Sequence, residues 1–410
     1  AGAWCGQNKY LSAIKNAFQN FMPLTIAGAI GVLWCNVLVN ESTGLGIFFK
    51  PIMALEFLNP AFQAVNFCTI SCITVGITLG IAQEIGVWNM GAERAGYIPG
   101  LVGLAAWLSV TNTSHMVEGA KEAFTGIAGN ELGATGLFTG MIIGVLSVEL
   151  FCFFEKQDAL KIKMPEQVPP GVARAFEVLV PATITLIITA CIGSACYNLT
   201  GLYLNDVIKN GIQGPLGAVG ATIPGVMIIY LVIMLFWLVG IHGNNMLSAV
   251  KEALFTPLAL ENVEKFNKGE KPTNIINMYF LQMCGEFGGS GVTIGLVIAI
   301  MIFGKREDNK AIASLSLVPG LFNINETVTF GIPMVLNPIL GIPFVFACLV
   351  TILVGYVLTV IGFCPVACLT VPWTTPPIVF GFLACGANVM GAVTQAILIV
   401  VSTVIYVPFL

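Results

Sequence analysis

The chain has 410 residues and is 57% hydrophobic and only 9% charged, with a formal net charge of −4. Soluble domains carry about 25% charged residues, so this chain lacks the charge needed to cover a surface that faces water. The composition indicates an all-α polytopic membrane protein. No basic stripe suggests a nucleic-acid partner.

Apolar runs of spanning length recur through the first part of the chain. Before the first run, residues 1–20 place Lys9 and Lys15 among apolar side chains at helical spacing, which predicts an amphipathic helix lying on the membrane. The predicted spans lie at about 20–39, 61–83, 97–112, 134–154, 175–197 and 218–241.

The linker at 155–174 is the clearest basic loop in the first half, because it carries three lysines and Arg174. The positive-inside rule places such a loop in the cytoplasm. Counting back four spans puts the amino terminus in the cytoplasm as well. The polar loop at 113–133 then faces outside, and a short surface helix is predicted within it at about 117–124.

Beyond residue 241 a simple alternation of spans fails. Lysines and an arginine argue for cytoplasmic loops at 265–271 and at 305–310, yet only the interrupted apolar segment 275–304 lies between them. Two cytoplasmic loops cannot flank a single span. A re-entrant hairpin is therefore predicted somewhere in 242–290, which includes part of the glycine-rich stretch 285–291.

Residues 319–345 are apolar enough for a bilayer but cannot form one plain helix. Glu326 lies among the breaks, and a carboxylate at membrane depth costs at least ~2.5–3.5 kcal/mol, so it normally faces a cavity or a partner. Non-helical backbone at that depth is tolerated only inside protein or beside water. This stretch is predicted to be a re-entrant element that carries polar groups into the membrane. Its interruptions are Pro319, Gly320, Gly331, Pro333, Pro338, Gly341 and Pro343.

The end of the chain alternates intact and broken segments. A span is predicted at 344–363, prolines exclude a regular helix over most of 364–377, and the last span lies at about 388–410. About ten full spans and two re-entrant hairpins are predicted in all. Because intact helices come first and broken ones later, residues 1–174 are interpreted as a scaffold half and residues 175–410 as a substrate-binding half.

Polar residues form four clusters at membrane depth in the second half. The lone histidine of the first can also be a hydrogen-bonding core residue, the glutamate of the second can order a loop, and the tryptophan of the fourth can be an interfacial anchor. The third is the hardest to explain by structure alone, because burying its carboxylate is costly. The clusters are His242, Asn244 and Asn245; Glu286; Asn323, Asn325 and Glu326; and Trp373 with Thr374.

These side chains suit a neutral, polyhydroxylated ligand. A carboxylate accepts from adjacent hydroxyls, amides both donate and accept, and an aromatic face packs against the C–H side of a pyranose ring. No arginine lies in the clusters, which argues against an anionic substrate. No metal or cofactor is predicted, since most of the cysteines lie in apolar runs as packing residues and motifs such as GxxxxGK[ST] and HExxH are missing.

Three stretches carry a resemblance to a known family. They are GIHGNN at 240–245, FNINETVTFGIPMVLNP at 322–338 and VPWTTPPIVFGFLACG at 371–386, and the pattern NxNExxxFGxPxxxNP is specific. The sequence closely resembles the membrane-embedded EIIC permeases of the bacterial phosphoenolpyruvate-dependent sugar phosphotransferase system. The resemblance covers essentially the whole chain and lies in the lactose/cellobiose/diacetylchitobiose branch, closest to its diacetylchitobiose members.

The resemblance implies several properties that composition does not. Such permeases lie in the lipid of the bacterial inner membrane, form homodimers through the amino-terminal half and hold the sugar in the carboxy-terminal half. Their partners EIIA and a cysteine-phosphorylated EIIB phosphorylate the sugar on its 6-hydroxyl, so the residue that carries the phosphoryl group belongs to a partner. By motif match, His242 and Glu326 lie near that hydroxyl, and Glu286 matches less securely. Asn244, Asn325, Trp373 and Thr374 line the rest.

The predicted function is the sugar-translocating subunit for a β-linked disaccharide: N,N'-diacetylchitobiose, cellobiose or lactose. One alternative is a proton-coupled disaccharide symporter with Glu326 and His242 as the proton relay. Another is a membrane enzyme acting on lipid-linked sugars, which needs a metal or nucleotide site that the sequence does not display. The first function produces sugar phosphate, and the second produces free sugar accumulated by a pH gradient.

Overall fold

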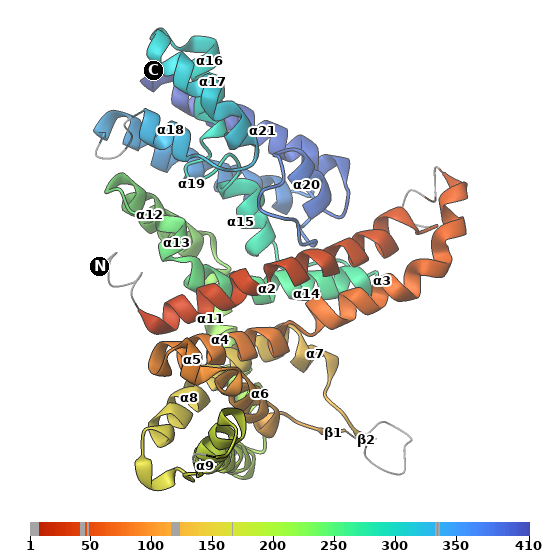
Figure 1. The fold of residues 1–410 in the computed structure, drawn as a ribbon. Helices are drawn as coiled ribbons and strands as arrows, with labels where there is room; N and C mark the ends of the chain where they lie inside the picture. Colours follow the sequence, from red (N-terminus) through yellow and green to blue (C-terminus); the bar gives the residue numbers. More distant parts are fainter. Residues whose placement is uncertain are drawn as a thin grey trace. The chain divides into compact units, whose positions relative to one another are not determined.

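The computed structural model describes residues 8–41, 46, 49–115, 124–165, 167–332, 334 and 337–410. In these residues nearly all regular structure is helical, and the only strands are β1 (Ser114–His115) and β2 (Phe124–Thr125), which pair antiparallel (Figure 1). Most of the surface helix predicted at 117–124 lies outside the described residues; its last residue, Phe124, is in β2.

The described chain forms two compact units. The first contains Phe67–Leu216 with residues up to Thr25, and the second contains Ile26–Asn66 with Gly217–Leu410. The change of unit near residue 216 lies well after the boundary at residue 174 predicted from helix integrity. The roles assigned to the two halves stay a prediction.

Helix α2 (Lys9–Leu33) combines the predicted surface helix and much of the first predicted span in one continuous element. Several of its polar side chains have partners inside the first unit. Lys9 Nζ lies 2.5 Å from Glu149 Oε1, and Asn16 Nδ2 donates to Glu84 Oε2 at 2.9 Å. Because these partners satisfy the polar face, the helix has no need to end and lie flat at residue 20.

The first unit is built on α4 (Ile73–Met90), α6 (Ile98–Val110) and α8 (Ala134–Glu155), which pack against one another (Figure 1). Small residues allow this close approach: a Cβ on Gly103 would lie 2.3 Å from the Cβ of Ala82. The other elements of this unit are α5 (Ala92–Ala95), α7 (Gly129–Leu132), the 3₁₀ helix Asp158–Leu160, α9 (Pro170–Thr200), α10 (Leu204–Ile208), and the π-helical turns Phe67–Ser71 and Lys209–Gln213.

The second unit contains most of the broken helices. Helix α21 (Val389–Tyr406) packs against α16 (Ile294–Phe303) and α19 (Pro338–Val360) and forms its centre (Figure 1). Its remaining elements are the π-helical turn Trp34–Leu38, the 3₁₀ helices Lys50–Leu58 and Val407–Phe409, α3 (Asn59–Asn66), α12 (Ile223–Leu238), α13 (Gly243–Met246), α14 (Ser248–Asn267), α15 (Met278–Gly285), α17 (Glu307–Leu321), α18 (Glu326–Gly331) and α20 (Val379–Ala384); α11 (Gly214–Gly220) crosses the boundary between the units.

The predicted interruption of 319–345 is confirmed in part. The helices α17 and α18 are separated by a turn at 322–325. Pro319 and Gly320 lie within the last turn of α17, however, and Gly341 and Pro343 lie within α19, so none of these four interrupts its helix. Pro338 occupies the first turn of α19, where a helix does not need the missing N–H. A proline further along a membrane helix is tolerated when neighbouring groups satisfy the freed carbonyl. Pro333 lies outside the described residues.

The predicted non-helical stretch at 364–377 is confirmed, and its backbone is held by side chains and by a neighbouring helix end. Asn262 and Asn277 donate to the carbonyl of Ala367 at 3.0 and 3.1 Å. The amides of Cys368 and Leu369 donate to the carbonyl of Ala384. Backbone groups that prolines remove from a helical pattern are thereby paired inside protein.

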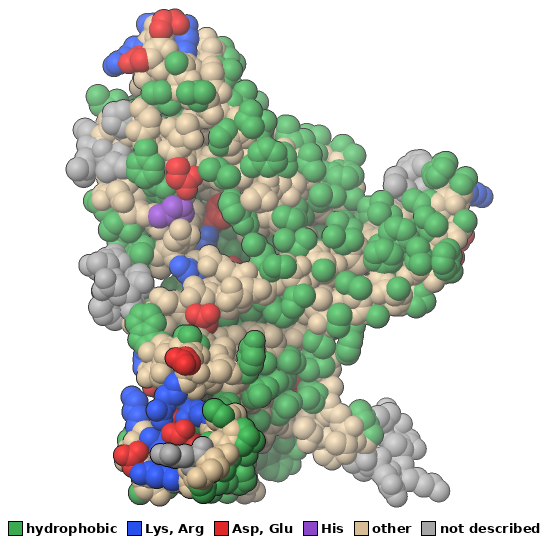
Figure 2. Space-filling model, viewed as in Figure 1, with side chains coloured by type: hydrophobic (Ala, Val, Ile, Leu, Met, Phe, Trp, Pro, Cys, Tyr) green, Lys and Arg blue, Asp and Glu red, His purple; other side chains and the backbone are tan. Residues whose placement is uncertain are grey.

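Five helices among the described residues are long and apolar enough to span a membrane, or six if a pair bent by 42° at Cys72 counts as one span. That bend divides the second predicted span. Three further apolar helices (Ile98–Val110, Ile223–Leu238 and Ile294–Phe303) are shorter than the roughly 20 residues that a membrane span takes. The visible face of the molecule is largely hydrophobic, and its charged side chains gather in a few groups (Figure 2). The count of ten spans with two hairpins stays a prediction.

Candidate functional site

The GIHGNN turn fixes the orientation of His242. Its ring lies against Trp237, with ring centroids 4.5 Å apart, and its Nδ1 accepts the backbone N–H of Asn245 at 3.2 Å. Because Nδ1 accepts, a neutral ring carries its proton on Nε2. The turn requires glycine at 243, since a Cβ there would lie 2.0 Å from the carbonyl oxygen of Ile233.

His242 faces Glu326, which begins α18. The distance from His242 Nε2 to Glu326 Oε1 is 4.0 Å, and the two side chains are 37% and 50% exposed. That distance is too long for a direct hydrogen bond, so both groups can still bind a third one. A hydroxyl oxygen about 2.8 Å from each can accept from Nε2–H and donate to the carboxylate. Figure 2 shows histidine beside acidic side chains on this face.

The glycine-rich turn after α15, at 286–291, lies beside the turn that carries Asn325. Gly288, Gly289 and Gly291 have positive φ angles of 69°, 89° and 77°, a region that glycine enters without steric cost. A Cβ on Gly289 would lie 2.6 Å from Cγ of Asn325. Glycine here therefore permits both the turn and the close approach of Asn325.

Asn323 and Asn325 connect three turns through their side-chain amides. Asn323 accepts from the N–H of Gly288 at 2.6 Å and donates to the carbonyls of Trp373 and, at 3.1 Å, Thr375. Asn325 is 4% exposed and donates to the carbonyl of Ser290 at 2.8 Å. Asn323 has φ = 63°, which asparagine tolerates better than most residues. These two amides hold the site's framework together.

The remaining predicted side chains differ in exposure. Trp373 is 44% exposed and lies in the non-helical stretch whose backbone Asn323 holds. Asn245 is exposed and Thr374 is partly buried. The structure thus brings His242 and Glu326 face to face, and it joins the backbone of Trp373 to Asn323.

Three further residues of this network were missed by sequence reasoning: Lys251, Tyr230 and Ser290. Lys251 Nζ donates to Oε1 of Glu286 and, at 3.1 Å, to Oδ1 of Asn244. Tyr230 donates to the same Glu286 oxygen at 2.6 Å, and Asn244 donates to Ser290 Oγ at 2.9 Å. A lone lysine in the apolar stretch 242–260 was a usable signal, because a cation at membrane depth requires a partner.

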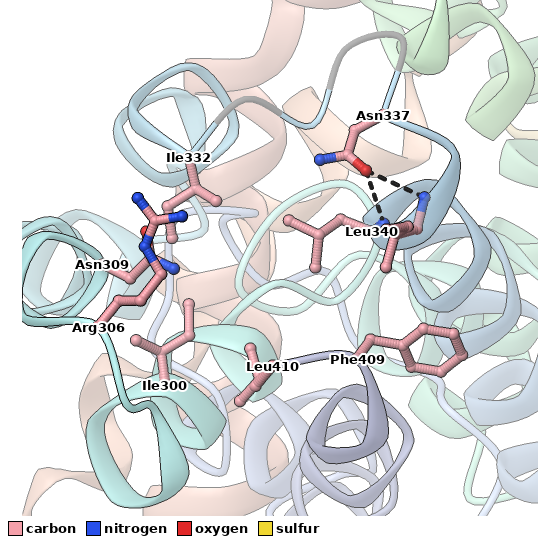
Figure 3. A pocket seen from close by; sticks show the side chains of 9 residues that line it. Ile300, Arg306, Asn309, Ile332, Asn337, Leu340, Phe409 and Leu410 are labelled. Carbon is pink, nitrogen blue, oxygen red and sulfur yellow. Dashed lines mark hydrogen bonds between the residues drawn. The ribbon is translucent and has the colours of Figure 1, made fainter.

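A cavity of about 250 Å³ lies elsewhere in the same unit (Figure 3). Arg306 and Asn309 enter it from one side, and Asn337 caps the first turn of α19 by accepting from the N–H groups of Ile339 and Leu340. None of the predicted sugar-binding residues lines it. The polar network around His242 and Glu326 is therefore the better candidate site.

Long apolar helices, with a polar network set among broken ones, define a multi-pass membrane protein with a candidate site for a polar ligand. The particular family follows from comparison. The model of the phosphotransferase system EIIC family matches residues 15–348, and the chain belongs to this family, whose members lie in the bacterial inner membrane.

Two relatives and one solved structure illustrate the similarity. The oligo-beta-mannoside-specific EIIC component of Bacillus subtilis is 34% identical, with 98% of this chain and 89% of that protein covered. The lactose-specific EIICB component of Streptococcus mutans is 27% identical, with 98% and 69% covered. The crystal structure of the transporter ChbC, the IIC component from the N,N'-diacetylchitobiose-specific phosphotransferase system, matches with a TM-score of 0.90 at 29% identity, covering 99% of this chain and 94% of that one.

Proposed function

We propose that this EIIC protein binds a β-linked disaccharide within its second unit and delivers it to the cytoplasm, where an EIIB partner phosphorylates the 6-hydroxyl. The observation that carries the proposal is the pair His242 and Glu326, 4.0 Å apart and both accessible. Family membership and relatives named for oligo-beta-mannoside, lactose and N,N'-diacetylchitobiose support the substrate class.

The pair suits a reacting hydroxyl. His242 Nε2–H donates to the 6-oxygen, and Glu326 accepts its proton as the bond from phosphorus to that oxygen forms and the bond from phosphorus to the EIIB cysteine sulfur breaks. The thiolate of EIIB is the leaving group. EIIA resupplies EIIB with phosphate, and the EIICB relative, whose name joins the two components in one chain, supports EIIB as the direct partner.

The other predicted residues complete the proposed site. Asn244, Asn245 and Thr374 offer hydrogen bonds to the remaining hydroxyl or acetamido groups, and Trp373 offers an aromatic face to a sugar ring. Glu286 shares the Lys251 ammonium group with Asn244, and Asn323 and Asn325 hold the turns in place. No arginine belongs to this set, which fits an uncharged ligand.

The proposed architecture follows the same family. It consists of about ten spans and two hairpins, with the amino terminus in the cytoplasm. Two copies form a homodimer joined through residues 1–174. The basic loop at 155–174 supports the orientation through the positive-inside rule. Single cysteines at exposed positions of α4 and α8, compared with single cysteines at exposed positions of α19 in a background lacking native cysteines, test the dimer: cross-links confined to α19 would contradict it.

The deciding experiment uses vesicles with the purified protein. Radiolabelled diacetylchitobiose, cellobiose, lactose and mannobiose are offered outside, with and without phosphorylated EIIB inside. We expect a disaccharide phosphate to appear inside only with phosphorylated EIIB. Accumulation of free sugar driven by a pH gradient, independent of EIIB, would instead establish a proton symporter.

A further inference from the structure

Lys251 and Glu286 form an ion pair inside the second unit. The side chains of Lys251 and Glu286 are 7% and 19% exposed, and the same Glu286 oxygen also accepts the Tyr230 hydroxyl at 2.6 Å. The pair joins α14 to the residue that ends α15. It is neutral as a whole, which is how a charged side chain is tolerated at membrane depth.

The pair also determines how the amide of Asn244 is oriented. Lys251 Nζ donates to Asn244 Oδ1 at 3.1 Å, and Asn244 Nδ2 donates to Ser290 Oγ at 2.9 Å. An ammonium group can only donate, so the oxygen of Asn244 must face it. Without Lys251 the amide can rotate by half a turn, because the Ser290 hydroxyl can bond either end.

Ser290 connects Asn244 to the turn that precedes α18. Ser290 accepts from Asn244 through its hydroxyl and from Asn325 through its carbonyl at 2.8 Å. Asn325 directly precedes Glu326 in the chain. Hydrogen bonds thus link Lys251 to Asn244 and Asn244 to the Ser290 hydroxyl, and a separate bond links the Ser290 carbonyl to Asn325 beside Glu326.

We propose that Lys251 is a positioning residue that fixes Asn244 in the one amide orientation able to bind the sugar. This inference rests on the proposed function, because it assigns Asn244 to the sugar site. Glu286 neutralises the lysine and holds it there. Lys251 itself acts on the sugar through Asn244.

The test separates positioning from simple stabilisation. Lys251→Met leaves the Glu286 charge without its cation and is expected to lower both the unfolding temperature and disaccharide affinity. The double variant Lys251→Met/Glu286→Gln removes both charges, and we expect its unfolding temperature to return close to that of the unaltered protein. Affinity should stay about tenfold weaker, as expected when a hydrogen bond of a charged group is lost. Recovery of affinity together with stability would overturn the proposal.

A second comparison isolates Asn244. Asn244→Ala should weaken binding in the unaltered protein but cause little further loss in the Lys251→Met/Glu286→Gln background; fully additive losses would overturn the assignment. Glu264→Gln is the control: this exposed glutamate of α14 pairs with Lys268 in its own helix, and affinity should be unchanged. If the unaltered protein binds none of the four disaccharides, the proposed function fails too; binding with additive losses refutes only the role of Lys251.

Discussion

The two units use small and polar residues in different ways. In the unit of Phe67–Leu216, glycines such as Gly103 allow helices to approach one another, and charges pair at helix ends. In the other unit, Gly288 and Gly289 form turns with positive φ, and buried amides pair with the backbone of those turns. Pairing at helix ends leaves helices intact, whereas pairing within turns leaves breaks where a polar ligand can enter.

One charge network of the first unit illustrates pairing at helix ends. Glu155, at the end of α8, is buried and lies 2.8 Å from an Arg94 nitrogen and 2.9 Å from an Arg174 nitrogen, and both arginines also contact Glu177. These bonds join α5, α8 and α9 near the predicted cytoplasmic loop. The hydrogen bond to Glu155 raises the pKa of Arg94 above its ordinary value. Two arginines thus neutralise the buried Glu155 carboxylate from within the unit, which indicates a structural role.

The largest effect is expected from replacing a buried amide that pairs with the backbone of a turn in the second unit. Asn325→Leu keeps the approximate shape but leaves the buried Ser290 carbonyl without its donor, so the free energy of unfolding should fall by about 1–3 kcal/mol. Disaccharide binding should weaken as well, because the turns that carry Ser290 and Glu326 separate. Thermal unfolding in detergent and a binding titration measure the two effects. Reduced stability with unchanged affinity would show that this turn is not part of the site.

Glu326→Gln should separate binding from stability. The carboxylate is half exposed, so the unfolding temperature should change little, while sugar affinity should fall by roughly ten- to a hundredfold through loss of hydrogen bonds to a charged group. Titration of the purified protein measures this, and Glu93→Gln, an exposed carboxylate of the other unit, is the control. Unchanged affinity would remove Glu326 from the site.

Arg174→Met tests the network in the first unit. Arg94 still pairs with Glu155, so the loss of unfolding free energy should be smaller than for a fully unpaired buried charge, about 1–2 kcal/mol. Disaccharide affinity should stay the same, since the network belongs to the other unit. Calorimetry and titration together check this. A loss of affinity comparable with that of Glu326→Gln would show that the two units are coupled.

The smallest effect concerns an exposed pair in the linker. A hydrogen bond from Lys161 holds the pKa of Asp158 below its ordinary value. A lowered carboxyl pKa stabilises the folded state above the ordinary value of about 3.9, and that stabilisation is lost as pH falls through the lowered pKa. Asp158→Asn should therefore lower the unfolding temperature slightly at pH 7 and by less at pH 3. An equal difference in unfolding temperature between the variant and the unaltered protein at both pH values would show that the pair of Lys161 and Asp158 does not cause it.

The sequence by itself determined features that depend on local backbone chemistry and on the cost of burying charge. The prolines of 364–377 exclude a helix wherever the stretch lies, and the apolar runs at 134–154 and 388–410 form helices because only paired backbone is stable in an apolar setting. The cost of a carboxylate at membrane depth is enough to distinguish the segment of Glu326 from a plain span. The family motifs added the substrate class and the partners.

Tertiary structure decided which partner each polar group takes. The pairing of Lys251 with Glu286, 35 residues apart in the chain, follows from the packing of α14 against the end of α15, and nothing local to either residue specifies it. Packing likewise allowed α19 to pass through Gly341 and Pro343, which sequence patterns treated as breaks. Local patterns state what a residue requires, whereas only the folded arrangement states what is within hydrogen-bonding distance to satisfy it.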